Sequence, residues 1–324
     1  MKVAVAGTAG LAQHITRAVA EEGHEYPFFL HTKILGLTKS SNQQRPQLAE
    51  NGFRVIQVDY FNPASLHSAL IGVDTVISTV SGAPQLALID SCLTACVRRF
   101  APAEFEGVPY ERPMIEQGRK KIDTLNRLRE VKERLQSTAF CCGIFYEWFG
   151  PGGLSRSGVS AGTILETTPT SRVFVGDEAC YMLDFRNERA TIPAYSEKGS
   201  DVYACFTAAA DVGSFVAKCL SMEAWPEQLR MRGERLKLLD FVRIAEAVKD
   251  RVFSVTIIDS EELHEQAIDA EEAEDWEKVS KLEALIAAQR GELDFLGANA
   301  NDCLPEVKTL SFKQWLSKAW AQEA

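Results

Sequence analysis

The chain has 324 residues, of which 46% are hydrophobic and 25% are charged, a composition typical of a soluble globular enzyme with one large or two modest domains. Its formal net charge of −10 argues against a general nucleic-acid surface, because neutralising phosphates requires clustered Lys and Arg. No apolar run approaches the roughly 20 residues that a membrane span needs. We therefore expect a soluble, cytoplasmic protein that has neither nucleic acid nor a membrane as its direct partner.

The cysteines and histidines show no pattern of a disulfide framework or a metal site. The eight cysteines form no CxxC pair, and the five histidines lack HxH and HxxxH spacing. Cys92 and Cys96 fall on an expected helix, and Cys141 and Cys142 fall in an expected apolar strand, where cysteine behaves as a small hydrophobe. We expect reduced thiols that pack in the core, and no metal catalysis.

An apolar strand over residues 3–6 runs into a glycine turn and a helix-like segment, in the order Gly7-Thr8-Ala9-Gly10-Leu11-Ala12-Gln13. This pattern indicates a dinucleotide site. Gly7 permits the tight turn, Gly10 lets the backbone approach a pyrophosphate, and the amides that open the helix face the anion. Gln13 stands where the motif has its third glycine, and its side chain would push the helix off the strand or reach toward the phosphates. A plain turn in a parallel sheet is the alternative interpretation.

Strand-like and helix-like segments alternate as far as about residue 145. The expected strands cover residues 3–6, 34–37, 53–58, 75–79, 97–100 and 139–144, and residues 25–33 look like an insertion before the second strand. Such alternation predicts an α/β fold with a doubly wound parallel Rossmann sheet, which binds ligands across the carboxyl ends of its strands. We assign residues 1–150 to this domain and residues 151–324 to a smaller α/β substrate-binding region, with some exchange of chain between the two.

The segment over residues 261–290 is rich in Glu and Ala, with apolar residues at helical intervals. This spacing predicts one or two amphipathic helices. A solvated helical cover is favoured over a docking face for a partner.

The end of the second expected strand indicates which nicotinamide cofactor binds. An NAD enzyme usually offers an acid to the ribose hydroxyls there, whereas an NADP enzyme offers Arg or Lys to the 2′-phosphate. Lys39 and Ser40 therefore favour NADP(H), with a solvated lysine in a polar turn as the alternative. Asp59 is placed to accept from the adenine edge, and Thr79 and Val80 to line the path of the ribose and pyrophosphate, although turn chemistry explains these three residues equally well.

Three segments resemble the signatures of a known family. Residues 74–85 (DTVISTVSGAPQ) resemble "VDVVISTVG…Q", residues 97–107 (VRRFAPAEFEG) resemble "VKRFxPSEFG", and residues 210–213 resemble a "DVG" segment. On these motifs the chain resembles, over nearly its whole length, the isoflavone-reductase-like and NmrA-like group of atypical short-chain dehydrogenases. The resemblance implies an NADPH-binding Rossmann domain and a small substrate domain, with Gln85 and Phe105 flanking the nicotinamide.

Reductases of this family use a lysine on the helix that follows the second signature, where this chain has Arg119, Lys120 and Lys121. Lys121 shares a helix face with Leu125 and Leu128, which predicts a partly buried side chain, whereas Lys120 shares its face with polar residues. We expect Lys121 to contact the cofactor and to be the catalytic proton donor beside hydride transfer. A basic cluster at a solvated helix start is the alternative.

Gly143 follows the next expected strand and resembles the family's "GxF" turn, which borders the nicotinamide and the substrate. Phe145, Tyr146 and Trp148 would then form an aromatic wall for a planar or hydrophobic substrate. Packing of these side chains in a core between domains is equally consistent with the sequence.

These patterns together predict an NADPH-dependent reductase, with NADPH/NADP+ as cofactor, that acts on a small aromatic or polyketide-like secondary metabolite. A homodimer stays open. Departures from the family pattern at Gln13, Ala103 and Glu106 keep two alternatives: an NADP(H)-sensing regulator without turnover, and a non-redox isomerase or cyclase on the same scaffold. The residues expected to hold the pyrophosphate are Gly7, Thr8, Gly10, Leu11 and Ala12.

Overall fold

The computed structural model describes residues 1–7, 10–24, 28–31, 55–108, 116–159, 163–164, 177–321 and 323. Within them, a six-stranded parallel sheet has the order β3-β2-β1-β4-β6-β7. Its strands are β1 (Val3–Ala6), β2 (Phe28–His31), β3 (Val55–Val58), β4 (Thr75–Ser78), β6 (Arg99–Ala101) and β7 (Gln136–Ser137). The strand order reverses between β1 and β4, which opens a crevice at their carboxyl ends. The predicted doubly wound α/β fold is confirmed.

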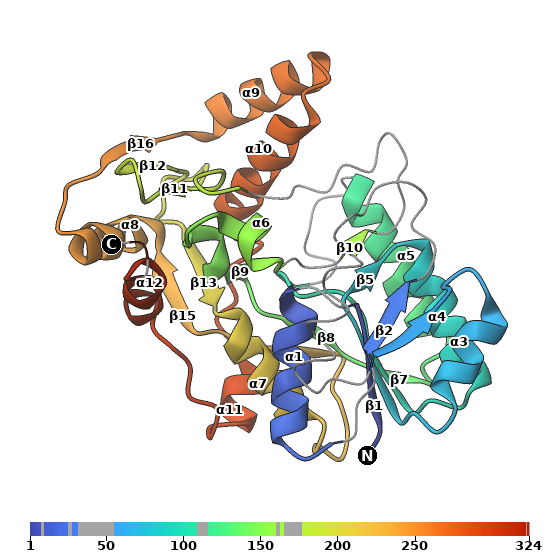
Figure 1. Ribbon diagram of the computed structural model, residues 1–324. Helices are drawn as coiled ribbons and strands as arrows, with labels where there is room; N and C mark the ends of the chain where they lie inside the picture. Colours follow the sequence, from blue (N-terminus) through green and yellow to red (C-terminus); the bar gives the residue numbers. More distant parts are fainter. Residues whose placement is uncertain are drawn as a thin grey trace.

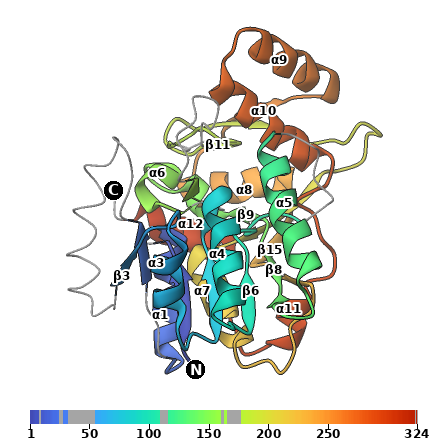
Figure 2. The ribbon, with the colours of Figure 1, turned by 90° about the vertical axis from the view of Figure 1, so that its right-hand side faces the viewer.

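Helices cover both faces of this sheet (Figures 1 and 2). Val3 and Val5 belong to a core with helices α1 (Gly10–Glu21) and α7 (Ala209–Cys219), whereas Ala4 and Ala6 belong to a core with α3 (Pro63–Leu70) and α4 (Ala83–Thr94). Helix α5 (Glu116–Glu130) lies beside α4. Because successive side chains of a strand point to opposite faces, a strand covered on both sides is apolar throughout, as β1 is.

Helices α1 and α7 lie side by side, although α7 belongs to the second half of the chain (Figure 1). A Cβ atom at Gly213 of α7 would lie 2.7 Å from the carbonyl oxygen of His14 in α1, so the absence of a side chain permits the close approach. Lys218 of α7 pairs with Glu22 at 2.7 Å. The second half therefore completes a layer of the first half, and the division at residue 150 stays a prediction.

Smaller sheets connect the Rossmann unit to the rest of the chain. Strand β8 (Ala139–Cys141) pairs with β14 (Gln228–Arg230), and β5 (Val80–Ser81) pairs with β10 (Thr163–Ile164). Strand β13 (Tyr203–Thr207) lies between β9 (Ile144–Phe145) and β15 (Glu234–Lys237). The fourth small sheet has the order β11-β12-β16, with β11 (Leu183–Asp184), β12 (Arg189–Ile192) and β16 (Ser254–Ile257).

A second hydrophobic core lies around β13. Phe149 contacts Phe206, Phe241 and Phe312 with ring centroids 4.8 to 6.2 Å apart. The core is closed by the short helix η1 (Tyr146–Phe149) and by α8 (Leu238–Lys249) and α12 (Phe312–Trp320). Two further short helices are α6 (Gly153–Ser157) and α11 (Asn299–Cys303).

The acidic segment forms two helices, α9 (Ser260–Glu272) and α10 (Trp276–Gln289). They project from the molecule as a hairpin (Figures 1 and 2). Their buried apolar side chains include Leu263, Leu282 and Leu285. The prediction of amphipathic helices in this segment is confirmed.

The second strand lies earlier than the sequence pattern predicts. Strand β2 pairs in parallel with β1, with Phe28 opposite Val5 and Phe29 opposite Ala6. The prediction that residues 25–33 form an insertion is therefore wrong, and residues 34–37 lie outside the described residues. Two short apolar runs follow each other here, and only pairing with β1 decides between them, because periodicity does not rank runs of this length.

All eight cysteines are free. Cys92, Cys141 and Cys142 are buried, as predicted, and burial raises the pKa of the Cys92 thiol. Cys96 is exposed and has a left-handed backbone conformation at the end of its helix, so the prediction of a core position is wrong for it. No helix in the described part of the chain is long and apolar enough to cross a membrane.

Candidate functional site

The turn after β1 requires glycine at position 7. Gly7 has a φ of +110°, and a Cβ atom there would collide with the hydroxyl of Thr79 at the end of β4. Thr79 donates from its backbone N–H and from its Oγ1 to the carbonyl of Ala6, both at 2.8 Å. The ends of β1 and β4 are thereby locked together at the crevice.

Gly10 opens α1 with a φ of +35°. A Cβ atom there would collide with the backbone of Gly158, just after α6, so glycine permits a close backbone approach at this position. The side chains of Leu11 and Ala12 are buried in the core. Contact of their backbone amides with a pyrophosphate at the helix N-terminus stays a prediction. Thr8 lies outside the described residues.

Gln13 does not displace the helix. Leu11, Ala12 and Ile15 share one core cluster with Val3 and Val5 of β1, and Gln13 itself is only partly buried. A close backbone contact of α1 is made with α7, at Gly213. Of the two predicted consequences of losing the third glycine, displacement from the strand is therefore wrong, and contact with phosphates stays a prediction.

Some of the residues predicted to bind the adenosine half of the cofactor lie outside the described residues. Strand β2 ends at His31, and both Lys39 and Ser40 lie outside the described residues. Asp59 follows β3, and its carboxylate accepts from the N–H of Phe61 at 3.0 Å in a local turn. The adenine contact of Asp59 and the 2′-phosphate contacts stay predictions.

Gln85 is fully buried and ties three segments together. Its Oε1 accepts from the N–H of Ala103 at 2.8 Å, and its Nε2 donates to the Thr124 hydroxyl at 3.2 Å. The glutamine thereby fixes the loop after β6 against α4 and α5. Val80, which begins β5, is also buried. Direct contact of Gln85 or Val80 with a cofactor stays a prediction.

Lys121 and Glu106 form an ion pair beside Gly143. The Nζ of Lys121 donates to Oε1 of Glu106 at 2.7 Å, and the lysine side chain is 17% exposed. The carbonyl of Glu106 accepts from the N–H of Cys142 at 2.9 Å and of Gly143 at 3.1 Å. The loop after β6, the helix α5 and the turn after β8 thus meet at one point. The predicted partly buried position of Lys121 is confirmed. The side chain of Lys120 lies outside the described part of the structure.

Sequence reasoning treated Glu106 only as a departure from the family pattern and missed its contact with Lys121. The sequence did contain a signal of this contact. Glu106 directly follows the "EF" pair, in the loop that precedes the helix carrying Lys121. Gly143 has a φ of +70°, and a Cβ atom there would collide with the Cys205 carbonyl of β13. Glycine is therefore required at this turn by backbone packing.

The aromatic residues near the site lie mainly in cores. Phe105 is fully buried and stacks on Phe140, with ring centroids 5.9 Å apart. Phe145 and Tyr146 are buried, and the Tyr146 hydroxyl donates to the carbonyl of Leu310 at 3.2 Å. Trp148 is partly buried. The arrangement favours core packing for Phe145 and Tyr146, and contact of the four aromatic residues with a cofactor or substrate stays a prediction.

Glu147 is a buried carboxyl group that the sequence reasoning did not single out. Its two carboxyl oxygens accept from the N–H of Ala209 at 3.0 and 3.2 Å, at the start of α7. Burial raises the pKa of Glu147 to about 7, and the nearby Asp211, whose own pKa burial raises to about 6, acts in the same direction. A charged residue inside an aromatic run offers no sequence signal of burial.

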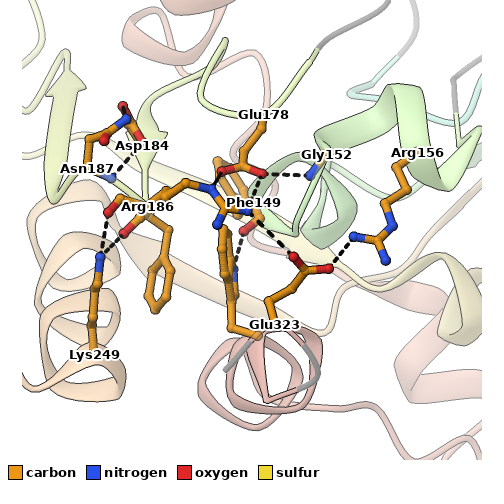
Figure 3. Close-up of polar contacts among 11 residues, drawn as sticks. Phe149, Gly152, Arg156, Glu178, Asp184, Arg186, Asn187, Lys249 and Glu323 are labelled. Atoms are coloured by element: carbon orange, nitrogen blue, oxygen red, sulfur yellow. Dashed lines mark hydrogen bonds and ion pairs between the residues drawn. The ribbon is translucent and has the colours of Figure 1, made fainter.

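A cavity of about 230 Å³ lies next to Glu147, between α6 and α12. Arg156 and Glu323 pair across its rim at 2.5 Å, and Trp315 lines it. Figure 3 shows how the adjoining ion pair of Glu178 and Arg186, at 2.6 Å, continues this polar rim and how the N–H of Gly152 donates to Glu178. These contacts hold α12 against α6.

Glu147→Gln should change the pH dependence of stability. Glutamate in an unfolded chain ionises near pH 4.3, so between that pH and about 7 the folded state retains a proton that the unfolded state has lost, and stability falls as pH rises. Glutamine does not ionise. Relative to wild type, the variant should therefore gain up to about 3 kcal/mol in free energy of unfolding between about pH 4 and about pH 8.

Urea unfolding at the two pH values measures this gain for Glu147→Gln, with the exposed Glu133→Gln as a control that should show almost none. An equal difference between variant and wild type at both pH values would mean that Glu147 is not held protonated.

Comparison with known proteins places the chain in a family. The NmrA-like family model matches residues 1–311. The chain belongs to the NmrA-like family. A bifunctional pinoresinol-lariciresinol reductase from Linum usitatissimum is 30% identical over 164 residues, which are 48% of this chain and 52% of that protein. The corresponding enzyme of Sinopodophyllum hexandrum is 28% identical over 166 residues, 48% of this chain and 53% of that protein. The chain thus matches about half the length of these curated relatives.

Three solved structures share the fold of this chain. An isoflavone reductase superposes with a TM-score of 0.73 at 17% identity, over 98% of each chain. AtPrR2 with NADP+ and (+)pinoresinol superposes with a TM-score of 0.73 at 20% identity, over 98% of each chain. The leucoanthocyanidin reductase–NADPH complex from Vitis vinifera gives 0.72 at 16% identity, over 99% of this chain and 100% of that one. At these identities the likeness shows the fold alone.

Proposed function

We propose that this NmrA-like protein is an NADPH-dependent reductase of a small aromatic or polyketide-like secondary metabolite. The observation that carries the proposal is the ion pair of Lys121 and Glu106 at the carboxyl edge of the sheet, beside Gly143. Structural relatives have been solved with NADP+ or NADPH, and the two curated relatives are reductases of pinoresinol and lariciresinol. These likenesses support the same class of reaction for this chain.

The described residues fit a dinucleotide at the crevice. Gly7 and Gly10 provide two positions without a side chain where the backbone must come close to a neighbour, and α1 begins at the second of them. The amides of Leu11 and Ala12 would hold the pyrophosphate, with Lys39 and Ser40 for the 2′-phosphate. Bound NADPH supplies a hydride at the nicotinamide end.

Lys121 would supply the proton. A lysine ammonium carries three N–H donors, and one of them is committed to Glu106, so the carboxylate orients Nζ while other donors stay available to a substrate oxygen. The limited exposure of Lys121 restricts its contact with water, which strengthens its interaction with a developing negative charge. Donation from Lys121 Nζ to the substrate would accompany hydride arrival and would leave a neutral amine beside Glu106.

A titration with NADPH, NADP+ and NADH tests the cofactor assignment. We expect tight binding of NADPH and weak binding of NADH, followed by nicotinamide fluorescence or calorimetric heat. If Lys39 reads the 2′-phosphate, Lys39→Ala should weaken NADPH binding at least about tenfold, the worth of one charge-assisted contact, and leave NADH binding unchanged. Equal loss for both cofactors would contradict the role of Lys39, and absence of binding to any of them would contradict the proposed function.

Turnover separates the reductase from its alternatives. With NADPH bound, a reductase should lose nicotinamide absorbance when carbonyl, enone or benzylic ether substrates are added. Binding without oxidation across such a panel would favour the NADP(H)-sensing regulator, and substrate conversion without any cofactor would favour an isomerase or cyclase.

A further inference from the structure

A cavity of about 200 Å³ lies at the free edge of the six-stranded sheet. Strand β7 is the last strand of this sheet and pairs with β6, whereas the next strand, β8, pairs with β14 of a different sheet. The chain therefore passes from one sheet to another at Thr138, between β7 and β8. The cavity opens at this break and is lined by the segment around Thr138, by α5 and by the segment that leads into β14.

This cavity is distinct from the dinucleotide crevice. The crevice lies at the carboxyl ends of β1 and β4, and β6 separates β4 from β7. Gly7, Lys121 and Gly143 do not line the cavity. A ligand bound here would therefore be a third molecule beside the cofactor and the proposed substrate, and its binding does not depend on the reductase proposal.

Two hydrogen-bond donors lie at the break between the sheets. Thr138 is 1% exposed, and within the described ranges its hydroxyl has no hydrogen-bond partner. The N–H groups of Gln136 and Thr138 face β6, where they donate to the carbonyls of Arg98 at 3.0 Å and Phe100 at 3.4 Å. Because backbone groups alternate along a strand, the N–H of Ser137 points away from β6, toward the free edge. Buried polar groups are nearly always hydrogen-bonded, so the Thr138 hydroxyl calls for an acceptor.

The lining of the cavity attracts negative charge. Arg129 and Lys132, at the end of α5 and just after it, line the cavity and are exposed. Glu227 is the single acid among the described residues that line it, so positive charge predominates here in a chain whose net charge is −10. A carboxylate only accepts hydrogen bonds, which matches the hydroxyl of Thr138 and the outward N–H of Ser137 as donors.

The rest of the lining is mainly apolar, and its largest side chain is held in place. Leu125 and Leu128 of α5 line the cavity together with Trp225. The Trp225 indole donates to the carbonyl of Cys219 at 2.9 Å, and its ring meets Phe140 edge-on with centroids 6.0 Å apart. Pockets for drug-sized ligands begin at about 300 Å³, so this smaller cavity suits an apolar body of about one ring.

We propose that this cavity is a second ligand site, which binds a small monocarboxylate with an apolar body about the size of one aromatic ring. The Thr138 hydroxyl and the Ser137 N–H donate to the carboxylate, and Lys132 and Arg129 attract its charge. The apolar body packs between α5 and the Trp225 ring. The ligand supplies the acceptor that the Thr138 hydroxyl lacks among the described residues.

Calorimetric titration with benzoate tests the site. We expect saturable binding of one benzoate per chain, with the same affinity in the presence and absence of NADP+, because the crevice lies elsewhere. Benzamide has the same ring but no charge and should bind at least about tenfold more weakly, the worth of a charge-assisted contact. Benzylammonium, which carries the opposite charge, should not bind. Absence of benzoate binding, competition between benzoate and NADP+, or equal binding of benzamide or benzylammonium would overturn the proposal.

Two substitutions locate the bound benzoate. Thr138→Val retains the side-chain shape and removes the hydroxyl, so the affinity for benzoate should fall about fivefold or more. The urea midpoint of the free protein should not fall in this variant, because no hydrogen bond is lost. Lys132→Met should weaken benzoate binding about threefold, the effect of one exposed charge.

Lys313→Met is the matched control, because it removes an exposed lysine of α12 that does not line the cavity. It should leave the affinity for benzoate unchanged. Unchanged affinity in Thr138→Val, a lower urea midpoint for that variant, or a loss in Lys313→Met equal to that in Lys132→Met would contradict the assignment of the site.

Discussion

Replacement of Lys121 by Met should lower kcat by about 10²- to 10⁴-fold, the usual contribution of a positioned proton donor. Methionine retains most of the side-chain volume, so the packing beside Leu125 is preserved while the N–H donors are lost. The affinity for NADPH should change little if the main role of Lys121 is proton donation. Steady-state kinetics of NADPH oxidation, together with a binding titration, separates the two effects.

Two variants give this experiment its controls. Lys120→Met removes a neighbouring positive charge and should leave kcat within a small factor of the wild-type value. Glu106→Gln keeps a hydrogen-bond acceptor for Lys121 but removes the charge, so it should reduce kcat less than Lys121→Met does. Full turnover of Lys121→Met with normal cofactor affinity would exclude Lys121 as the proton donor, and loss of activity in Lys120→Met alone would move the role to that residue.

Replacement of Arg99 by Met should lower the free energy of unfolding by about 3 kcal/mol or more. Arg99 is 1% exposed although it carries a charge. Its guanidinium donates to the Gln136 side chain at 2.9 Å and to the carbonyls of Leu220, Met222 and Glu223 at 3.1, 2.7 and 2.7 Å. Methionine would leave the three carbonyls without these donors and would detach the segment after α7 from β6.

The adjacent arginine provides a matched control. Arg98 pairs with Asp74 at 2.9 Å, but its side chain is 49% exposed, so Arg98→Met should cost about 1 kcal/mol or less. Urea unfolding of both variants measures the difference. Similar losses for the two variants would show that the buried hydrogen bonds of Arg99 do not link the two halves of the chain.

The sequence predicted the parallel sheet because its evidence is local. The strand at residues 3–6, the glycine turn after it and the strands near residues 75 and 99 carry apolar runs and turn residues that depend little on distant neighbours. The second strand was misplaced because two short apolar runs, at residues 28–30 and 34–37, have similar patterns. Pairing with β1 selects the first of them.

The candidate site could be predicted only in part. The helix face shared by Lys121, Leu125 and Leu128 predicted a partly buried lysine, because helical periodicity sets which side chains lie together. The Glu106 partner and the buried Glu147 could not be predicted in this way. Their environments are set by a loop and by a helix from the second half of the chain.

The sequence by itself determined the class of fold, the glycine turn at the crevice, the helix that bears Lys121 and the membership of a family, since each of these depends on residues close together in the chain. Only the tertiary structure decided that Glu106 is the carboxylate that pairs with Lys121, and that α1 packs closely against α7 at Gly213. It also decided that Arg99 joins β6 to the segment after α7. The physical reason is that these contacts join residues separated by 15 to 199 positions along the chain, and their geometry follows from packing of whole elements rather than from local propensity.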